Sequence, residues 1–391
     1  MADSTNETDL VRRKLLMAAG LAPLALGATR AFGQEARGTP LAGDFPLPDP
    51  AGERVRWAIV GLGNFAVGEA IPGFIDAQHS RMTAFVSGNP EKQKDLGARY
   101  GITRFYNYDN FDSIADDPEI DCVYIILPVG LHAEYTIRAL KAGKHVLCEK
   151  PMASTSAECQ AMIAAAKAAN RQLGVAYRIH FEPTNVRAKQ LIDGGEIGDM
   201  RYVSADHGFN ASFDWPPHVW RLQKALAGGG SMFDIGIYGL NTSLMMLGDV
   251  DPVELSAVYS YPTGDERFRE VEGGMEYRLR MPNGISVQGS SSYCWSPYIS
   301  RQSYIGSKGT IFMKPATTYD DNNIRVEGNG PNREVGAGNP LLQFQNQLDA
   351  FSLAAKANTP HKTPGEMGLR DIRLIEAMYR SAEAGGALIK L

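Results

Sequence analysis

The sequence predicts an α/β protein with two unlike halves: a parallel sheet covered by helices on both faces, followed by a large open sheet that is mostly antiparallel. Two observations carry this prediction. Between Val55 and about residue 177, apolar runs alternate with helical patterns, which is typical of a parallel sheet. After residue 180, apolar runs follow one another across turn signals such as Pro282-Asn283-Gly284, which indicates antiparallel pairing.

The bulk composition is that of an ordinary globular chain. Its 391 residues suggest about two domains, and 44% of them are hydrophobic and 21% charged. The formal net charge of −5 argues against nucleic acid or an anionic membrane as a partner, and no apolar run reaches the ~18 residues that a membrane span needs. The 4 cysteines lack the spacing of a zinc site, so we expect free thiols and no metal site.

Residues 1–33 have the pattern of a twin-arginine export signal. Arg12 and Arg13 precede the apolar run Leu15–Leu26, and small residues at 31 and 33 precede a cleavage site before Gln34. This pattern predicts export of the already folded protein to the periplasm. An ordinary secretory signal and a chance basic pair are the alternatives.

Residues 34–53 are rich in proline and lack apolar periodicity. Pro40, Pro46, Pro48 and Pro50 favour an extended chain, so we expect an arm that precedes the folded domains. The alternative is a disordered leader.

Residues 54–178 are expected to form the first domain. We expect strands near residues 55–60, 82–87, 122–127, 145–148 and 173–177, and helices near residues 66–78, 90–100, 131–142 and 155–170. Functional groups should gather at the carboxyl ends of these parallel strands.

A glycine turn follows the first strand directly. In Gly61-Leu62-Gly63-Asn64-Phe65-Ala66, the first glycine permits the tight turn, the second lets backbone amides approach a pyrophosphate, and the alanine packs helix on strand. The N-terminus of the helix then faces the phosphates. The pattern predicts a dinucleotide-binding domain of the Rossmann type, with Gly61, Leu62, Gly63, Asn64 and Phe65 at the cofactor.

The end of the second strand indicates which dinucleotide is bound. A site for NAD favours Asp or Glu there, because the carboxylate holds the ribose 2′-hydroxyl. This chain has Ser87-Gly88-Asn89-Pro90-Glu91-Lys92, whose hydroxyl and ammonium suit a 2′-phosphate. We therefore predict NADP. The alternative is that Ser87 only caps the helix that begins near Pro90.

Residues 179–391 are expected to form the second domain. We expect a helix near 183–193, a loop at 228–230, a helix from Asp234, strands near 253–261, 270–280, 284–293, 300–306 and 308–313, and helices near 341–357 and 366–384.

Two segments carry residues suited to acid–base chemistry. Lys150 follows the strand at 145–148 and therefore lies at the carboxyl edge of the sheet, although a surface loop lysine is the alternative. In the second segment Ser231 and Asp234 have the spacing of a capping box, and Asp234 and Tyr238 share one helix face. A lysine beside a tyrosine favours phenolate, which makes proton transfer feasible. Capping by Asp234 and packing by Tyr238 remain the alternative.

Several segments together resemble the glucose-fructose oxidoreductase/inositol dehydrogenase family, from the export signal to about residue 385. They are Gly61–Ala66, Ser87–Lys92, Tyr106–Tyr108, Ile125–Pro128, His132–Glu134, Glu149–Pro151, Trp220-Arg221, Gly228–Tyr238 and Pro315–Tyr319. Most of that family carries His where this chain has Tyr238, so the tyrosine narrows the resemblance to the sugar oxidoreductase branch.

The resemblance implies tightly held NADP, with Lys150, Asp234 and Tyr238 as the catalytic group. It implies that Ser87 and Lys92 hold the 2′-phosphate. Further cofactor contacts implied in the same way are Gly88, Asn89, Tyr108, Leu127, Pro128, His132, Glu149, Lys150, Arg178, Trp220, Arg221 and Tyr319. His180 and Tyr177 are expected to face the same crevice, where contact with sugar and simple packing are both open.

The resemblance also implies the activity. An aldose is oxidised at C1 to its lactone, with Tyr238 taking the hydroxyl proton, Lys150 stabilising the phenolate and Asp234 positioning the sugar and Tyr238. A second sugar, aldose or ketose, then takes the hydride back and becomes a sugar alcohol, which makes the cycle ping-pong. We expect monosaccharide substrates and a homo-oligomer, dimer or tetramer.

Two other functions fit the same fold. One is a nicotinamide-dependent glycosidase, against which Tyr238 counts because such relatives resemble the His version of the motif. The other is a non-catalytic, NADP-loaded sugar sensor, against which the presence of all three catalytic residues counts. The segments Phe213–His218 and Cys294–Tyr298 depart from the family's usual residues, which leaves the preferred sugars and the subunit contacts open.

Overall fold

The computed structural model describes residues 48–328 and 330–391. The predicted export signal and residues 34–47 of the predicted arm lie outside this part of the chain. Residues 48–53 of the arm are described and are anchored to the body of the protein. Ala51–Glu53 form a 3₁₀ turn, and the Asp49 carboxylate lies 2.8 Å from Lys356 Nζ and 3.0 Å from His79 Nδ1.

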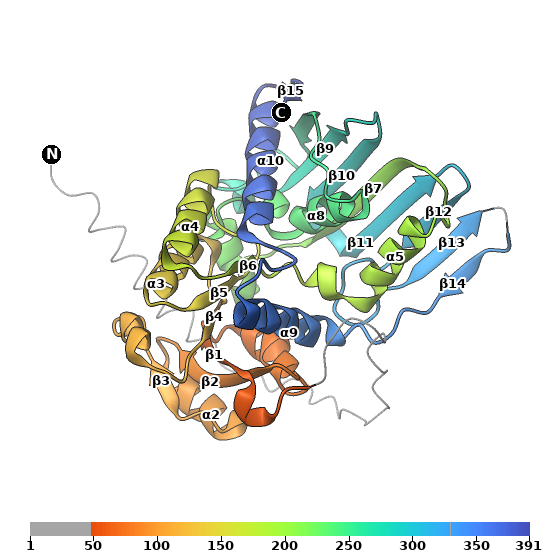
Figure 1. The fold of residues 1–391 in the computed structure, drawn as a ribbon. Helices are drawn as coiled ribbons and strands as arrows, with labels where there is room; N and C mark the ends of the chain where they lie inside the picture. Colours follow the sequence, from red (N-terminus) through yellow and green to blue (C-terminus); the bar gives the residue numbers. More distant parts are fainter. Residues whose placement is uncertain (1–47, 329) are drawn as a thin grey trace.

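The first domain contains a six-stranded parallel sheet in the order β3-β2-β1-β4-β5-β6 (Figure 1), which confirms the predicted parallel sheet. Its strands are β1 (Val55–Val60), β2 (Ser80–Val86), β3 (Arg104–Tyr106), β4 (Cys122–Ile125), β5 (His145–Cys148) and β6 (Leu173–Val175). The helices that follow them are α2 (Pro90–Tyr100), α3 (His132–Lys141) and α4 (Ser156–Ala169). Strand β3 was not predicted, because it has only three residues and two of them are exposed.

The predicted helix at 66–78 is wrong in its length. The chain forms a π-helical turn over Ala66–Ala70 and then a separate 3₁₀ turn over Pro72–Phe74. Pro72 has no N–H to continue the helical hydrogen bonds. Gly73 meets another element closely, since a Cβ there would lie 2.7 Å from Phe344 Cβ. The break therefore lets the following segment pack against the C-terminal part of the chain.

The second domain contains a nine-stranded sheet in the order β14-β13-β12-β11-β7-β10-β9-β8-β15. Its strands are β7 (Met200–Asn210), β8 (Glu254–Tyr259), β9 (Gly274–Arg280), β10 (Ser286–Ser292), β11 (Cys294–Gly306), β12 (Gly309–Met313), β13 (Ile324–Gly328), β14 (Arg333–Val335) and β15 (Ile389–Lys390). All pairs are antiparallel except β7 with β10, which is parallel. The predicted mostly antiparallel sheet is confirmed.

The central strand β7 was missed by the sequence prediction. It has no continuous apolar run, because the polar residues Ser204 and Asp206 alternate with the buried Val203 and Ala205. The same pattern places a buried face against helices and a polar face toward solvent.

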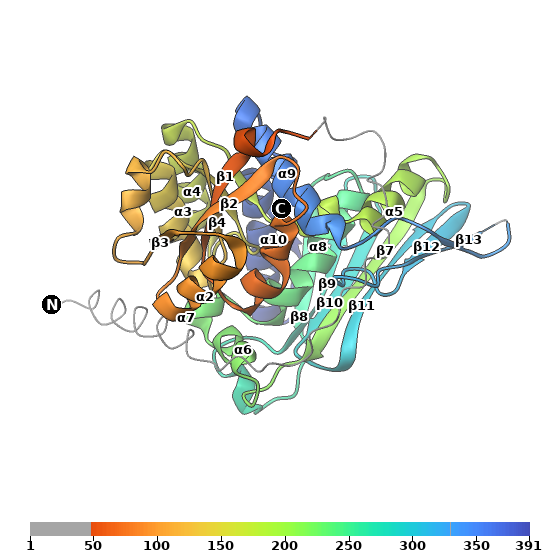
Figure 2. The same cartoon turned by 90° about the horizontal axis from the view of Figure 1, so that it is seen from below.

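Six helices accompany this sheet in the described part of the chain: α5 (Pro183–Asp193), α6 (Pro216–Val219), α7 (Lys224–Ala227), α8 (Ile237–Met246), α9 (Leu342–Ala357) and α10 (Gly365–Glu383). Helix α8 packs on β7, and α10 packs on β8 and on α4 of the first domain (Figure 1). Helix α9 lies between the two sheets in Figure 2 and contributes Leu348 and Phe351 to the core beneath β1. The two domains therefore share helices rather than meeting at a flexible linker.

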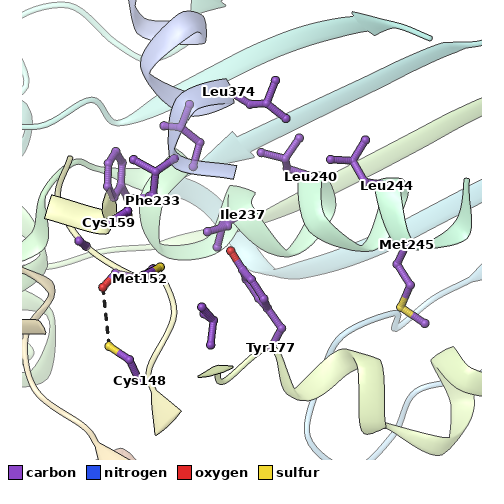
Figure 3. Packing of buried hydrophobic residues seen from close by; sticks show 14 of the residues in the cluster. Cys148, Met152, Cys159, Tyr177, Phe233, Ile237, Leu240, Leu244, Met245 and Leu374 are labelled. Carbon is purple, nitrogen blue, oxygen red and sulfur yellow. Dashed lines mark hydrogen bonds between the residues drawn. The ribbon is translucent and has the colours of Figure 1, made fainter. Parts of the chain in front are cut away.

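One apolar cluster joins the two domains beneath helix α8. Figure 3 shows Cys148, the last residue of β5, and Met152 of the following loop in one cluster with Ile237 and Leu240 of α8. The Cys148 thiol contacts the Met152 carbonyl at 3.6 Å. All four cysteines are free thiols, as predicted. Among the described helices, none is both long enough and apolar enough to cross a membrane.

Candidate active site

The glycine turn after β1 has the geometry of a dinucleotide site. Gly61 has φ +93°, and a Cβ there would lie 2.1 Å from Ile126 O at the end of β4, so only glycine fits. Gly63 is exposed, with no atom within 4 Å of where its Cβ would be, and the helical turns begin at Asn64. Backbone N–H groups at this open helix N-terminus suit a pyrophosphate.

Ser87 and Lys92 lie beside that turn. Lys92 Nζ donates to Leu62 O at 2.8 Å, and burial lowers the pKa of Lys92. Ser87 does not cap α2: its Oγ accepts from Asn89 N at 3.1 Å, while Asn89 is the N-cap and accepts from Lys92 N at 2.9 Å. A Cβ on Gly88 would lie 3.3 Å from the Tyr108 ring, so the predicted cofactor residues of this segment lie near one another and near Tyr108.

Two other predicted cofactor residues hold the loops at the sheet edge. His132 is 1% exposed, and its ring nitrogens lie 2.7 Å from Leu127 O and 2.8 Å from Pro151 O. The Glu149 carboxylate accepts from Tyr124 OH at 2.6 Å and from Lys150 N at 3.1 Å. Burial raises the pKa of Glu149 and lowers that of His132. Both side chains thus fix the loops that carry Leu127, Pro128 and Lys150.

The structure brings Lys150, Asp234 and Tyr238 together at the carboxyl edge of the parallel sheet. Lys150 Nζ donates to Asp234 O at 2.7 Å and lies 3.5 Å from Asp234 Oδ1. It also lies 4.6 Å from the centroid of the Tyr238 ring. Lys150 therefore contacts the ring face, and its hydrogen bond goes to Asp234 rather than to the phenol hydroxyl.

The Asp234 carboxylate is fixed by two further residues. Arg221 Nε donates to Oδ2 at 2.8 Å, and Tyr293 OH donates to the same oxygen at 3.1 Å. Burial alone would raise the pKa of Asp234, but Arg221, Lys150 and Tyr293 outweigh it and lower the pKa to about 2. Asp234 is thus a permanent anion at neutral pH. Arg221, which was predicted to contact the cofactor, binds Asp234 here. Its guanidinium carbon lies 4.6 Å from the centroid of the Trp220 ring.

The predicted capping box at Ser231 is wrong. Ser231 has helical φ and ψ, and its hydroxyl pairs with Ser291 Oγ at 2.9 Å. The helix N-terminus is capped instead by Glu272, whose carboxylate accepts from Gly230 N and Met232 N, both at 2.8 Å. Neither Glu272 nor Tyr293 has a local sequence signal that marks it, because each reaches the site from a distant part of the chain.

Arg178 is the hydrogen-bond partner of the Tyr238 hydroxyl. Its Nε donates to Tyr238 OH at 3.3 Å, and its guanidinium carbon lies 4.8 Å from the Tyr238 ring centroid and 4.4 Å from that of Tyr319. Tyr319 also contacts the Phe65 ring, with centroids 6.4 Å apart. The sequence prediction placed Arg178 at the cofactor and gave Lys150 the role at the phenol oxygen.

His180 and Tyr177 lie in the protein interior. His180 Nε2 contacts Asn241 Oδ1 at 2.8 Å, Asn241 donates to Asp371 at 2.7 Å, and burial lowers the pKa of His180 to about 4. Tyr177 is 3% exposed and lies in the shared apolar cluster (Figure 3). Of the two open roles, packing is the one these contacts support. The described residues include no group of three or more potential metal ligands.

Comparison with known proteins places the chain in a family. Residues 55–177 match the model of an oxidoreductase family with an NAD-binding Rossmann fold, and residues 185–312 match the GFO/IDH/MocA C-terminal domain. The chain is 31% identical over 334 residues to D-xylose 1-dehydrogenase [NADP(+)] of Haloarcula marismortui, covering 84% of this chain and 91% of that one.

Solved structures of other oxidoreductases are also similar to this chain. Aldose-aldose oxidoreductase of Caulobacter crescentus, complexed with glycerol, is 42% identical, with a TM-score of 0.81 over 86% of this chain and 100% of that one. An inositol dehydrogenase homolog of Azotobacter vinelandii, at 22% identity and a TM-score of 0.76 over 87% of this chain and 98% of that one, shares the fold. This chain is an enzyme with an NAD(P)-binding Rossmann domain and belongs to the GFO/IDH/MocA family of oxidoreductases.

Proposed function

We propose that this protein is an NADP-dependent sugar oxidoreductase that oxidises an aldose at C1 to its lactone and reduces a second sugar, aldose or ketose, to a sugar alcohol. The observation that carries the proposal is the convergence of Lys150, Asp234 and Tyr238 at the carboxyl edge of the parallel sheet, the edge at which the glycine turn follows β1. The similarity to an aldose-aldose oxidoreductase and to a D-xylose 1-dehydrogenase supports sugars as substrates.

The residues at the cofactor crevice fit NADP. The open backbone at Gly63 suits the pyrophosphate, and Ser87 and Lys92 suit the 2′-phosphate, since Lys92 already reaches the loop at Leu62. When bound, NADP supplies the acceptor for the C1 hydride and the donor for the second sugar. Retention of the cofactor between the two half reactions makes the cycle ping-pong.

The protein's own residues move and orient the proton. Tyr238 takes the proton of the C1 hydroxyl in the oxidation and returns it to the carbonyl oxygen of the second sugar in the reduction. Asp234 stays ionised, so it orients Lys150 and the sugar rather than exchanging a proton. Lys150 is held between Asp234 and the face of the Tyr238 ring, which fixes its ammonium in the site.

The proposal is tested on the purified protein. Denaturation should release NADP, and addition of aldoses one at a time should raise the absorbance of bound NADPH, which a second sugar then lowers. Recovery of NAD or of no nucleotide would contradict the cofactor. Bound NADP that responds to no sugar would favour the sensor, and cleavage of a nitrophenyl glycoside would favour the glycosidase.

We also propose a homo-oligomer, dimer or tetramer, formed on the outer face of the nine-stranded sheet. In the described residues, helices cover the opposite face, while Glu276, Arg278 and Gln288 point outward and are exposed. Light scattering should report at least a dimer, and Arg278→Glu should weaken it. A monomer at micromolar concentration would contradict this proposal.

The twin-arginine pattern supports a periplasmic location, which we propose on the sequence alone. A fusion of residues 1–40 to a reporter should reach the periplasm only through the twin-arginine route, and Arg12→Lys together with Arg13→Lys should abolish that export. Export by the general secretory route would contradict the proposal.

A further inference from the structure

Arg178 is a buried cation that has no carboxylate partner. It is 4% exposed, and within residues 48–328 and 330–391 no carboxylate oxygen lies within 4.0 Å of its guanidinium. The other arginine of the site, Arg221, is half-buried and is paired with Asp234. A buried charge without an opposite charge in contact is costly to a folded protein, so we expect a guanidinium kept in this way beside the reacting groups to have a function.

The hydrogen bonds of Arg178 end on neutral oxygens. Its NH1 donates to Gln343 Oε1 at 2.5 Å and to Thr318 O at 3.2 Å, and its NH2 donates to Thr317 O at 2.6 Å. Its Nε donates to Tyr238 OH at 3.3 Å. Of these four acceptors only the Tyr238 oxygen becomes negative when it loses a proton. The three other bonds hold the guanidinium in place at that oxygen.

Lys150 does not supply this charge in the structure. Its ammonium donates to Asp234 O at 2.7 Å and is balanced by the Asp234 carboxylate at 3.5 Å. It faces the Tyr238 ring rather than the hydroxyl. The cation at the phenol oxygen and the cation over the ring are therefore different residues.

We propose that Arg178 is a further catalytic residue, whose guanidinium stabilises the Tyr238 phenolate while that oxygen takes and returns the sugar proton. The inference rests on the proposed function. In the oxidation the C1–H bond breaks with its electron pair going to the bound nicotinamide, and the C1 hydroxyl proton goes to the phenolate. In the reduction the phenol O–H breaks, its proton goes to the carbonyl oxygen of the second sugar, and the phenolate forms again beside Arg178.

Other titratable or charged groups also face this pair and are part of the test. They are Glu69, Glu149, Lys150, His207, Tyr298 and Tyr319. Burial lowers the pKa of His207 to about 3 and raises that of Tyr298 to about 12, so neither titrates near neutral pH. Burial raises the pKa of Glu69 to about 7, so Glu69→Gln is included to separate its titration from that of Tyr238.

The test compares Arg178→Gln with Gln343→Glu. The first removes the cation. The second keeps Arg178 and its position but gives the guanidinium a carboxylate partner, which should weaken its hold on a phenolate. A hydrogen bond to a charged group changes an equilibrium constant by roughly tenfold to hundredfold. In each variant the acid limb of the pH–rate profile for aldose oxidation should therefore move to higher pH by about one to two units. The matched control is Gln345→Glu, the same change two residues along α9, at a side chain that is not among the hydrogen-bond partners of Arg178.

Two measurements are made on the protein as purified, with its cofactor. The first is the pH dependence of single-turnover NADPH formation after mixing with an aldose. The second needs no sugar: it is the near-ultraviolet titration of tyrosinate, taken as the difference between each protein and its Tyr238→Phe partner. We expect both to shift upward in Arg178→Gln and Gln343→Glu, and neither to shift in Gln345→Glu.

The outcomes separate the two proposals. If the wild type forms no NADPH with any aldose, the proposed function fails and this role fails with it. If the wild type is active but neither variant moves its profile or its tyrosinate titration, the role of Arg178 alone is overturned. A uniform loss of rate at every pH would mean that Arg178 is structural. If Arg178→Gln does not fold, Gln343→Glu decides the question.

Discussion

Replacing Asp234 by asparagine removes one negative charge from the centre of the site while keeping its shape. Arg221 at 2.8 Å and Lys150 at 3.5 Å then lose their carboxylate. We expect a folded but less stable protein with a slower reaction. We also expect its pH–rate profile to keep both limbs, because Asp234 remains ionised at neutral pH and does not itself move the proton.

The size of the stability loss follows from the pKa of Asp234. The protein lowers it from 3.8 to about 2. At ~1.36 kcal/mol for each pKa unit, this corresponds to about 2 kcal/mol. The side chains of Asp234, Lys150 and Arg221 are 19%, 12% and 26% exposed, so solvent screens the pairs only in part. Breaking a buried pair costs ~3–5 kcal/mol, which sets an upper bound.

The sign of the pH dependence is fixed by the direction of the shift. Because the pKa of Asp234 is lower in the folded protein than in the unfolded chain, its contribution is fully present above about pH 4 and is lost as the pH falls through about 2. The difference in unfolding free energy between wild type and Asp234→Asn should therefore be constant between about pH 5 and pH 8.

The assay is urea unfolding at several pH values, combined with single-turnover kinetics. Asp199→Asn is the matched control, since Asp199 pairs with Arg201 at 3.3 Å with its side chain 82% exposed, and such surface pairs are worth ~0–1 kcal/mol. The reasoning is refuted if Asp234→Asn is as stable as this control. It is equally refuted if the variant loses a limb of the pH–rate profile, because Asp234 would then exchange a proton.

Four further predictions concern the rest of the site. Tyr238→Phe should keep its cofactor and lose ~10²–10⁴-fold in both half reactions, measured by single turnover; a loss below about tenfold would place the proton carrier elsewhere. Lys92→Ala should weaken NADP binding by roughly tenfold or more and leave NAD binding unchanged, measured on cofactor-stripped protein, and an equal loss for both would contradict its role at the 2′-phosphate. Glu272→Gln should cost ~1–3 kcal/mol in urea unfolding, because an amide N–H then faces a backbone N–H, and unchanged stability would count against the cap. A chain that starts at Glu53 should release NADP on dialysis, since it also lacks the Asp49–Lys356 contact, whereas full retention would mean that the arm is only a leader.

Much of the fold could be predicted because the strands of the first domain are buried on both faces. Strand β1, for example, is an apolar run bounded by a glycine turn, and its pairing follows from the alternation of strands and helices. Strand β7 could not be found in the same way, since its outward residues are polar, nor could the π-helical turn at Ala66–Ala70, which depends on how Pro72 and Gly73 meet α9.

The catalytic residues were predictable for a similar reason. Lys150 follows a recognisable strand, and Asp234 and Tyr238 share a helix face, so the local sequence pattern identifies all three as candidate site residues. Their partners were not predictable, because contacts set by the tertiary fold leave no local pattern. Tyr293 lies 59 residues beyond Asp234, and Gln343 lies 165 residues beyond Arg178.

Glu272 explains how an aspartate near a helix N-terminus can serve the active site. Such an aspartate commonly accepts backbone N–H groups of the first turn, and the spacing of Ser231 and Asp234 suggested this. Here Glu272 accepts from Gly230 N and Met232 N, and is itself held by Tyr379 OH at 2.7 Å. Both oxygens of Asp234 are therefore left for Arg221, Tyr293 and Lys150. Because a separate buried carboxylate caps the helix, the charge of Asp234 can organise the cations of the site.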